Sequence, residues 1–303
     1  MTPPIFVPRV EAGDPDYDAV TAAIESLPTT KPPALPPRTL QLAHHPSWVE
    51  ATRELPRPPV ERVASDRDLA ACGAAVAAVV AVLGPEAPQG SRVAVAVVPT
   101  RSGPGPKAPL VGVAGQQAYN VPAVALAYAK HLREKLQKLA VPSRLVYIEG
   151  HGPLCPSSTV EVLHRRLISP EVWSFTETAA GLFAEDVDLE AMDASSYGLI
   201  PGVAVPWLAR VDFGLCLRAL WGWLRSLETG PAPHLVVYEA GSVGLGAGDG
   251  CIRASEYQLL LRDKYVIEAC IRNDWPLVVL ASRRATIDAV TTVMDLVRRR
   301  EVG

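Results

Sequence analysis

A glycine-rich stretch is the part of this sequence whose residue types and spacing point most directly to chemistry. Residues 239–250 read EAGSVGLGAGDG, with glycine at every second position from Gly244 to Gly250. Glycine allows backbone angles and close approaches to a ligand that other residues do not. The loop could therefore hold a phosphate where a helix begins at Ser255. The spacing differs from GxGxxG and no P-loop lysine follows, so nucleotide or phosphate binding through residues 241–250 is our third hypothesis.

Two further groups carry chemically active side chains. The adjacent pair His44 and His45 has the side chains of a zinc ligand or a proton carrier, but it lies in a proline-rich stretch. We therefore discount a zinc or catalytic role for this pair. Arg283 and Arg284, together with Lys107, could form a cationic pocket for an anion. We favour the simpler interpretation that the two arginines begin a helix and lie on its solvated face.

Alternating apolar strands and amphipathic helices must position these residues. That alternation predicts an α/β fold, a single three-layer domain with a mostly parallel central sheet. Ligands bind beyond the carboxyl ends of such strands, so the loops at 99–119, 149–157, 239–255 and 281–286 are expected to meet at one edge. The expected strands are 93–98, 144–148, 172–176, 234–238 and 277–280. The expected helices are 66–83, 122–139, 158–166, 213–227, 255–273 and 286–300.

Residues 1–62 differ from the rest of the chain in their proline content. Thirteen of the 29 prolines lie within the first sixty residues. Proline fixes one backbone angle and removes a hydrogen-bond donor, so paired prolines are excluded from helix interiors. We expect residues 1–62 to form an irregular lead-in, with one helix at 17–27, that packs on the α/β domain of residues 63–303.

Composition and charge exclude several classes of protein. A net charge of −3 offers no basic surface for general nucleic-acid binding. The longest apolar run, residues 74–83, is half of the roughly 20 residues that span a bilayer, so no membrane span is expected. We expect no signal peptide at the N-terminus, because no basic flank leads into an apolar stretch there. Five scattered cysteines without a CxxC pair fit a reducing compartment, and we expect an intracellular protein, cytoplasmic or nuclear.

Three segments together resemble the histone deacetylase family. The first reads VVYEAG at 236–241, then GDG at 248–250 and a helix opened by Ser255, where the family has a strand, A/CGxD and GD. The second, GQQAYNVPAVALA at 115–127, is similar to GFCxFNNVAIAA. The third, RLVYIE at 144–149, is similar to the strand before the loop DxDxHHGNGTQ. The resemblance covers about residues 65–300 and implies an arginase/deacetylase-like fold.

The positions that the resemblance implies for catalysis carry other residue types. The family's proton-transfer histidines fall on Pro106 and Lys107, and its oxyanion-binding tyrosine falls on Arg284. Proline has no titratable group, and a lysine with an ordinary pKa is protonated and a poor base. The neighbouring amides Gln116 and Gln117 do not exchange protons either, so no catalytic residue is assigned. The implied pocket residues are Gly105, Lys107, Gln116, Gln117, Tyr119, Arg283 and Arg284.

The metal positions implied by the resemblance are also altered. An alignment without gaps puts Glu149 on an aspartate that supports the metal ligands, His151 on a ligand aspartate and Pro153 on the ligand histidine. Asp249 matches the third ligand, so this alignment leaves two possible ligands, His151 and Asp249. A two-residue deletion makes Glu149 and His151 mimic the ligand pair DxH, which gives three ligands with Asp249. Three protein ligands are what a catalytic zinc needs. We expect no cofactor, and zinc only if this site is retained.

The coordinated loss of groups from three loops decides the order of our hypotheses. We expect a histone-deacetylase-like pseudoenzyme, a scaffold or regulatory subunit that works through protein partners, in an oligomer or a larger complex. The alternative is a divergent zinc-dependent deacetylase or amide hydrolase that uses Glu149, His151 and Asp249. The nucleotide or phosphate binder is the third.

Overall fold

The computed structural model describes thirteen stretches of the chain. They are residues 3–7, 29–54, 59–85, 92–98, 119–136, 143–150, 159, 162–163, 166–174, 203–204, 213–241, 254–282 and 284–302. The helix expected at 17–27 and most of the one expected at 158–166 lie outside the described residues. All statements about the fold below refer to the described stretches.

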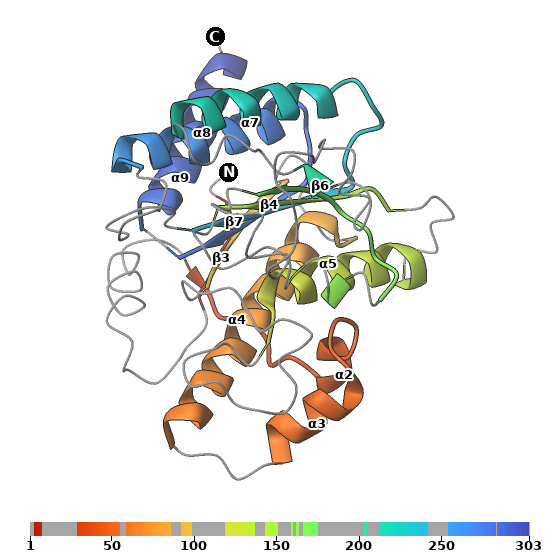
Figure 1. Cartoon of the computed structure of the whole chain (residues 1–303). Helices are drawn as coiled ribbons and strands as arrows, with labels where there is room; N and C mark the ends of the chain where they lie inside the picture. Colours follow the sequence, from red (N-terminus) through yellow and green to blue (C-terminus); the bar gives the residue numbers. More distant parts are fainter. Residues whose placement is uncertain are drawn as a thin grey trace, which may run out of the picture.

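A single eight-stranded sheet forms the centre of the molecule (Figure 1). Its strand order is β2-β1-β3-β8-β7-β4-β5-β6, and each pair of neighbours is parallel. This confirms the expected α/β class and the mostly parallel sheet. The strands are β1 (Ile5–Phe6), β2 (Thr29–Thr30), β3 (Val93–Val97), β4 (Leu145–Glu149), β5 (Glu171–Ser174), β6 (Val203–Ala204), β7 (Leu235–Ala240) and β8 (Leu277–Ala281).

The central strands are buried on both faces, which explains their continuous apolar sequences. In β3, with the sequence VAVAV, all five residues are buried. Val93, Val95 and Val97 pack into one hydrophobic cluster, whereas Ala94 and Ala96 pack into the other. Side chains alternate between the faces of a strand, so one sequence run serves two cores.

Helices cover both faces of the sheet and complete the three layers (Figure 1). One face carries the cluster to which α7, α8 and α9 contribute, and the other carries the cluster of α4 and α5. A side-chain capping box at Ser255 and Gln258 begins α8, as the sequence predicts for a serine before an apolar stretch. The helices are α4 (Pro59–Leu83), α5 (Val121–His131), α7 (Phe213–Leu227), α8 (Glu256–Arg272) and α9 (Arg284–Val302). After α5 comes a short π-helical turn, η1 (Leu132–Leu136).

The described part of the proline-rich lead-in is more regular than expected. It contains α2 (Pro37–Leu40) and α3 (Pro46–Glu54), and β1 pairs with β3 inside the main sheet. The prediction of an irregular segment is therefore wrong for these residues. Each of α2, α3 and α4 begins with a proline, because the first helical position needs no backbone donor and suits the fixed angle of proline.

Strand ends differ from prediction at the two positions that matter most for the site. β4 extends to Glu149 and β7 extends to Ala240, so Glu149 and Glu239 belong to strands and not to the following loops. α9 begins at Arg284, two residues earlier than expected. Among the described helices, none is long and apolar enough to cross a membrane.

Candidate functional site

Two carboxylates lie side by side where β4 and β7 end. These strands pair in register, with Glu149 opposite Glu239, and both side chains are buried. They alternate onto the same face as Tyr147, toward α4 and α5. The Tyr147 hydroxyl donates a hydrogen bond to Oε2 of Glu239. Burial, reinforced by the charges of Glu239 and Glu149, raises the pKa of Tyr147 well above its ordinary value, so this hydroxyl stays a hydrogen-bond donor.

A chain of polar contacts leads from this region to the start of α5. Asn120 caps that helix, with its Oδ1 accepting from the amide of Ala123 at 2.9 Å. The Thr159 hydroxyl donates to the same oxygen at 3.1 Å. The backbone N–H of Asn120 in turn donates to Nε2 of His44 at 3.0 Å. A helix cap on the domain is thus tied to a histidine of the lead-in.

His44 has a structural role in this network. Burial, together with the charge of Arg166, lowers its pKa to about 4, so the ring is neutral and Nε2 can accept from the Asn120 amide. The Arg166 guanidinium donates to the backbone carbonyls of Ala43, at 3.2 Å, and His44. A neutral imidazole fixed between these groups serves packing. Its neighbour His45 is exposed.

On the opposite face of the sheet, Arg262 clamps the ends of the same two strands. This fully buried side chain of α8 donates from Nη1 to the carbonyl of Gly150 at 2.9 Å and from Nη2 to that of Gly241 at 2.8 Å. Gly150 and Gly241 are the first residues after β4 and β7. A Cβ on Gly150 would lie 2.8 Å from Nη1 of Arg262 and 2.9 Å from the carbonyl oxygen of Glu239, so this position requires glycine.

Asp263 balances the charge of Arg262 and completes a buried network. Its Oδ1 accepts from Nη2 of Arg262 at 2.7 Å and from the Tyr238 hydroxyl at 2.5 Å. Its Oδ2 accepts from the hydroxyl of Thr286 in α9 at 2.8 Å. A buried ion pair is tolerated when additional hydrogen bonds satisfy both partners, as here. The clamp was missed by sequence reasoning, although an adjacent Arg-Asp pair within an otherwise apolar helix face was a visible signal.

The third strand of this edge, β8, is joined to β7 by the first residue that follows it. Ala281 at the end of β8 pairs with Ala240 of β7. The Ser282 hydroxyl donates to the carbonyl of Ala240 at 3.2 Å. Two residues later Arg284 begins α9, so the ends of β4 and β7 and the start of α9 lie along one edge of the sheet.

The described structure reaches three of the predicted site residues. Glu149 lies at the carboxyl edge, and Arg284 follows the same edge after β8. Tyr119 is buried, and its hydroxyl lies 2.6 Å from that of Thr52 in α3. The predicted residues outside the described stretches are Gly105, Pro106, Lys107, Gln116, Gln117, His151, Asp249 and Arg283.

Of the three possible zinc ligands, only the carboxylate of Glu149 lies within the described stretches. No group of three His, Cys, Asp or Glu side chains that could hold a metal ion occurs within the described stretches. Glu149 would need both His151 and Asp249, which follow β4 and β7, to complete a three-ligand set. The described free thiols, Cys72 and Cys270, are buried, and burial raises the pKa of each, which makes them poor ligands and nucleophiles.

Chemically, the described site is a buried, hydrogen-bonded edge of the sheet at which two loops begin side by side. Glu149 and Glu239 lie at the strand ends with the Tyr147 hydroxyl bonded to Glu239, and Arg262 holds the first carbonyl of each loop. No protein-family model matches the sequence, and a search of curated proteins found no match either.

Proposed function

We propose that this protein is a histone-deacetylase-like pseudoenzyme, which acts as a scaffold or regulatory subunit in a protein complex. The observation that carries the proposal is the residue type at the positions of the family's proton-transfer pair, Pro106 and Lys107. Loss of a general base costs roughly 10²–10⁴-fold in rate. Loss of one oxyanion donor, whose position falls on Arg284, costs about 10²–10³-fold more.

Two features of the described edge support this proposal. α9 begins at Arg284, so this residue belongs to a helix directly after β8. The buried titratable groups Arg262, Asp263 and Tyr147 are hydrogen-bonded between elements of the fold. Their geometry serves the joining of strands and helices, which a scaffold retains after the chemistry is lost.

A deacetylase assay tests the proposal directly. The purified full chain, with zinc added, is incubated with an acetyl-lysine peptide, and acetate release is measured. The expected rate equals that of a matched variant carrying His151→Ala and Asp249→Ala. Turnover above this control would contradict the pseudoenzyme and favour the zinc-dependent hydrolase.

The pairing of β4 with β7 favours that hydrolase as the second candidate. The loops that carry His151 and Asp249 begin at neighbouring strand ends, held by one arginine. If bound, zinc would polarise an amide carbonyl and activate water. Metal analysis of protein purified without chelators separates the candidates: near-stoichiometric zinc that is lost on Asp249→Ala supports the hydrolase, and its absence supports the pseudoenzyme.

A further inference from the structure

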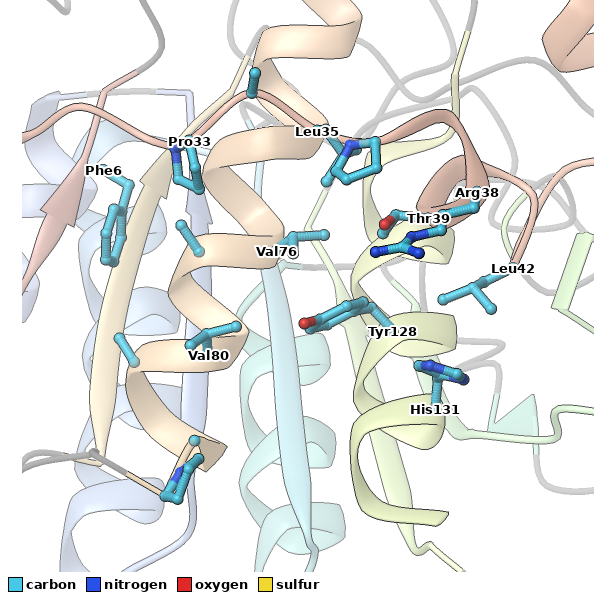
Figure 2. Close-up of a pocket in the computed structure, with 16 residues that line it drawn as sticks. Phe6, Pro33, Leu35, Arg38, Thr39, Leu42, Val76, Val80, Tyr128 and His131 are labelled. Carbon is cyan, nitrogen blue, oxygen red and sulfur yellow. The ribbon is translucent and has the colours of Figure 1, made fainter. Parts of the chain in front are cut away.

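An apolar groove lies on the layer formed by α4 and α5, apart from the carboxyl edge of the sheet. Figure 2 shows that its lining extends across α4, from Phe6 of β1 on one side to Tyr128 and His131 of α5 on the other, with residues 33–42 of the lead-in as a further wall. Its volume is about 1160 Å³. The groove follows the C-terminal halves of α4 and α5, which lead to the amino ends of β3 and β4. A ligand here would therefore not occupy the candidate site.

The shape and lining of the groove favour a polypeptide segment over a small molecule. The volume exceeds the roughly 300–1,000 Å³ of typical small-molecule pockets. The α4 wall presents Val76, Val80 and the small residues Ala77 and Ala81, and Gly84 follows directly after the helix. Val80 is 41% exposed, and few other large apolar side chains of the described residues are exposed. Small residues between larger ones leave the grooves into which a second helix packs.

Charge is confined to one part of the groove and has one sign. In Figure 2 Arg38, Tyr128 and His131 lie toward α5, whereas Val80 lies on α4 and Phe6 lies on the side of α4 away from α5. The side chains of the lining that can carry charge, Arg38 and His131, are both basic. Arg38 is exposed, and the described structure contains no ion pair or hydrogen bond of its guanidinium. An acidic group on the occupant would complement this cation.

We propose that the groove binds an amphipathic helix of a partner protein. The helix places apolar side chains at spacings of i, i+3 or i+4 and i+7 along α4, and an Asp or Glu at the end beside Arg38. This inference rests on the proposed scaffold function, because it names the chemistry of the partner. The groove lies apart from the candidate site that the deacetylase assay tests, so turnover in that assay would refute the pseudoenzyme without testing the groove.

The test selects the partner chemistry from a defined library. Helical peptides with leucine at i, i+3 and i+7 and the other positions randomised are displayed on phage and selected on the full chain. Selected peptides are synthesised with fluorescein, and their affinities are measured by fluorescence anisotropy. The thermal melting temperature of each variant is measured first, and Ala81→Arg replaces Val80→Glu should the latter unfold.

We expect an Asp or Glu to be enriched at one end of the selected peptides. Their affinity should fall about tenfold or more on Val80→Glu and on Arg38→Glu. Leu260→Glu and Arg218→Glu, exposed positions on α8 and α7, should leave the affinity unchanged. A peptide with lysine in place of its acid should bind the Arg38→Glu chain better than the original peptide does.

Four outcomes would overturn the inference. They are the absence of peptides that distinguish the wild-type chain from Val80→Glu, selected peptides without an acidic end, and saturable binding of palmitate that displaces the peptides. The fourth is a dimer of the wild-type chain in sedimentation that Val80→Glu dissociates, because the occupant would then be a second copy of this chain.

Discussion

Arg262→Met is the substitution expected to damage the fold most, because it removes the clamp between β4 and β7. It leaves the carboxylate of Asp263, which is 1% exposed, without its cation. It also takes the donors from the carbonyls of Gly150 and Gly241. Removing one partner of a buried ion pair costs about 3–5 kcal/mol. Since whole domains are stable by only about 5–15 kcal/mol, such a loss should be visible in any unfolding experiment.

Urea denaturation followed by circular dichroism measures this loss. The matched control is Arg225→Met, which removes an exposed arginine paired with Glu228 at 3.3 Å. Exposed ion pairs contribute about 0.2–1 kcal/mol, so this variant should unfold near the wild-type midpoint. A double variant, Arg262→Met with Asp263→Asn, should regain part of the stability, because the neutral amide no longer needs a buried cation.

Two results would refute this reasoning. A loss below about 1 kcal/mol for Arg262→Met would mean that the buried pair does not hold the strand ends together. A double variant as unstable as the single one would mean that the damage does not come from the uncompensated charge of Asp263.

Three further predictions concern the same edge and the lead-in. Gly150→Ala should destabilise the chain by about 1–3 kcal/mol, because its Cβ would overlap neighbouring atoms. Gly222→Ala, at an open position on helix α7, should instead stabilise the chain by about 0.5–1 kcal/mol. Equal unfolding midpoints for the two variants would contradict this prediction. The pKa of His44 is lowered to about 4, so the unfolded state binds the proton more tightly, and stability should fall by up to roughly 3 kcal/mol from about pH 6.5 down to about pH 4. Denaturation at several pH values should show a flatter profile for His44→Gln, and an unchanged slope would count against it. Tyr147→Phe removes the donor to the buried Glu239 and should cost about 1–3 kcal/mol in urea denaturation; a wild-type midpoint would show that this hydrogen bond is dispensable.

The main strands and helices could be predicted because each follows from a local pattern. The expected helix 213–227 agrees with α7 at both ends. The expected strands overlap β3, β4, β5, β7 and β8. Errors arose at boundaries, as at Glu149 and Glu239. A glutamate at a strand end resembles a loop residue until its neighbour in the sheet is known.

The lead-in shows a different limit of local patterns. Its prolines indicated irregular backbone, yet Pro37, Pro46 and Pro59 each begin a helix. Proline excludes a helix interior but favours its first position, so composition alone cannot distinguish these cases. The strand Ile5–Phe6 is too short to carry a periodic signal, and its pairing with β3 supplies its stability.

The sequence by itself determined that this chain builds an α/β fold with a sheet buried on both faces, because apolar strands such as β3 alternate with amphipathic helices along it. It also determined which residue types stand at the positions implied by the deacetylase resemblance, since Pro106 cannot transfer a proton in any fold. Only the tertiary structure decided that β4 lies next to β7, which brings Glu149 opposite Glu239. The same pairing lets Arg262 bond the first carbonyl after each of the two strands. The physical reason is that parallel strands pair through backbone groups common to all residues. The order of strands therefore depends on how whole layers pack, and no local pattern contains it.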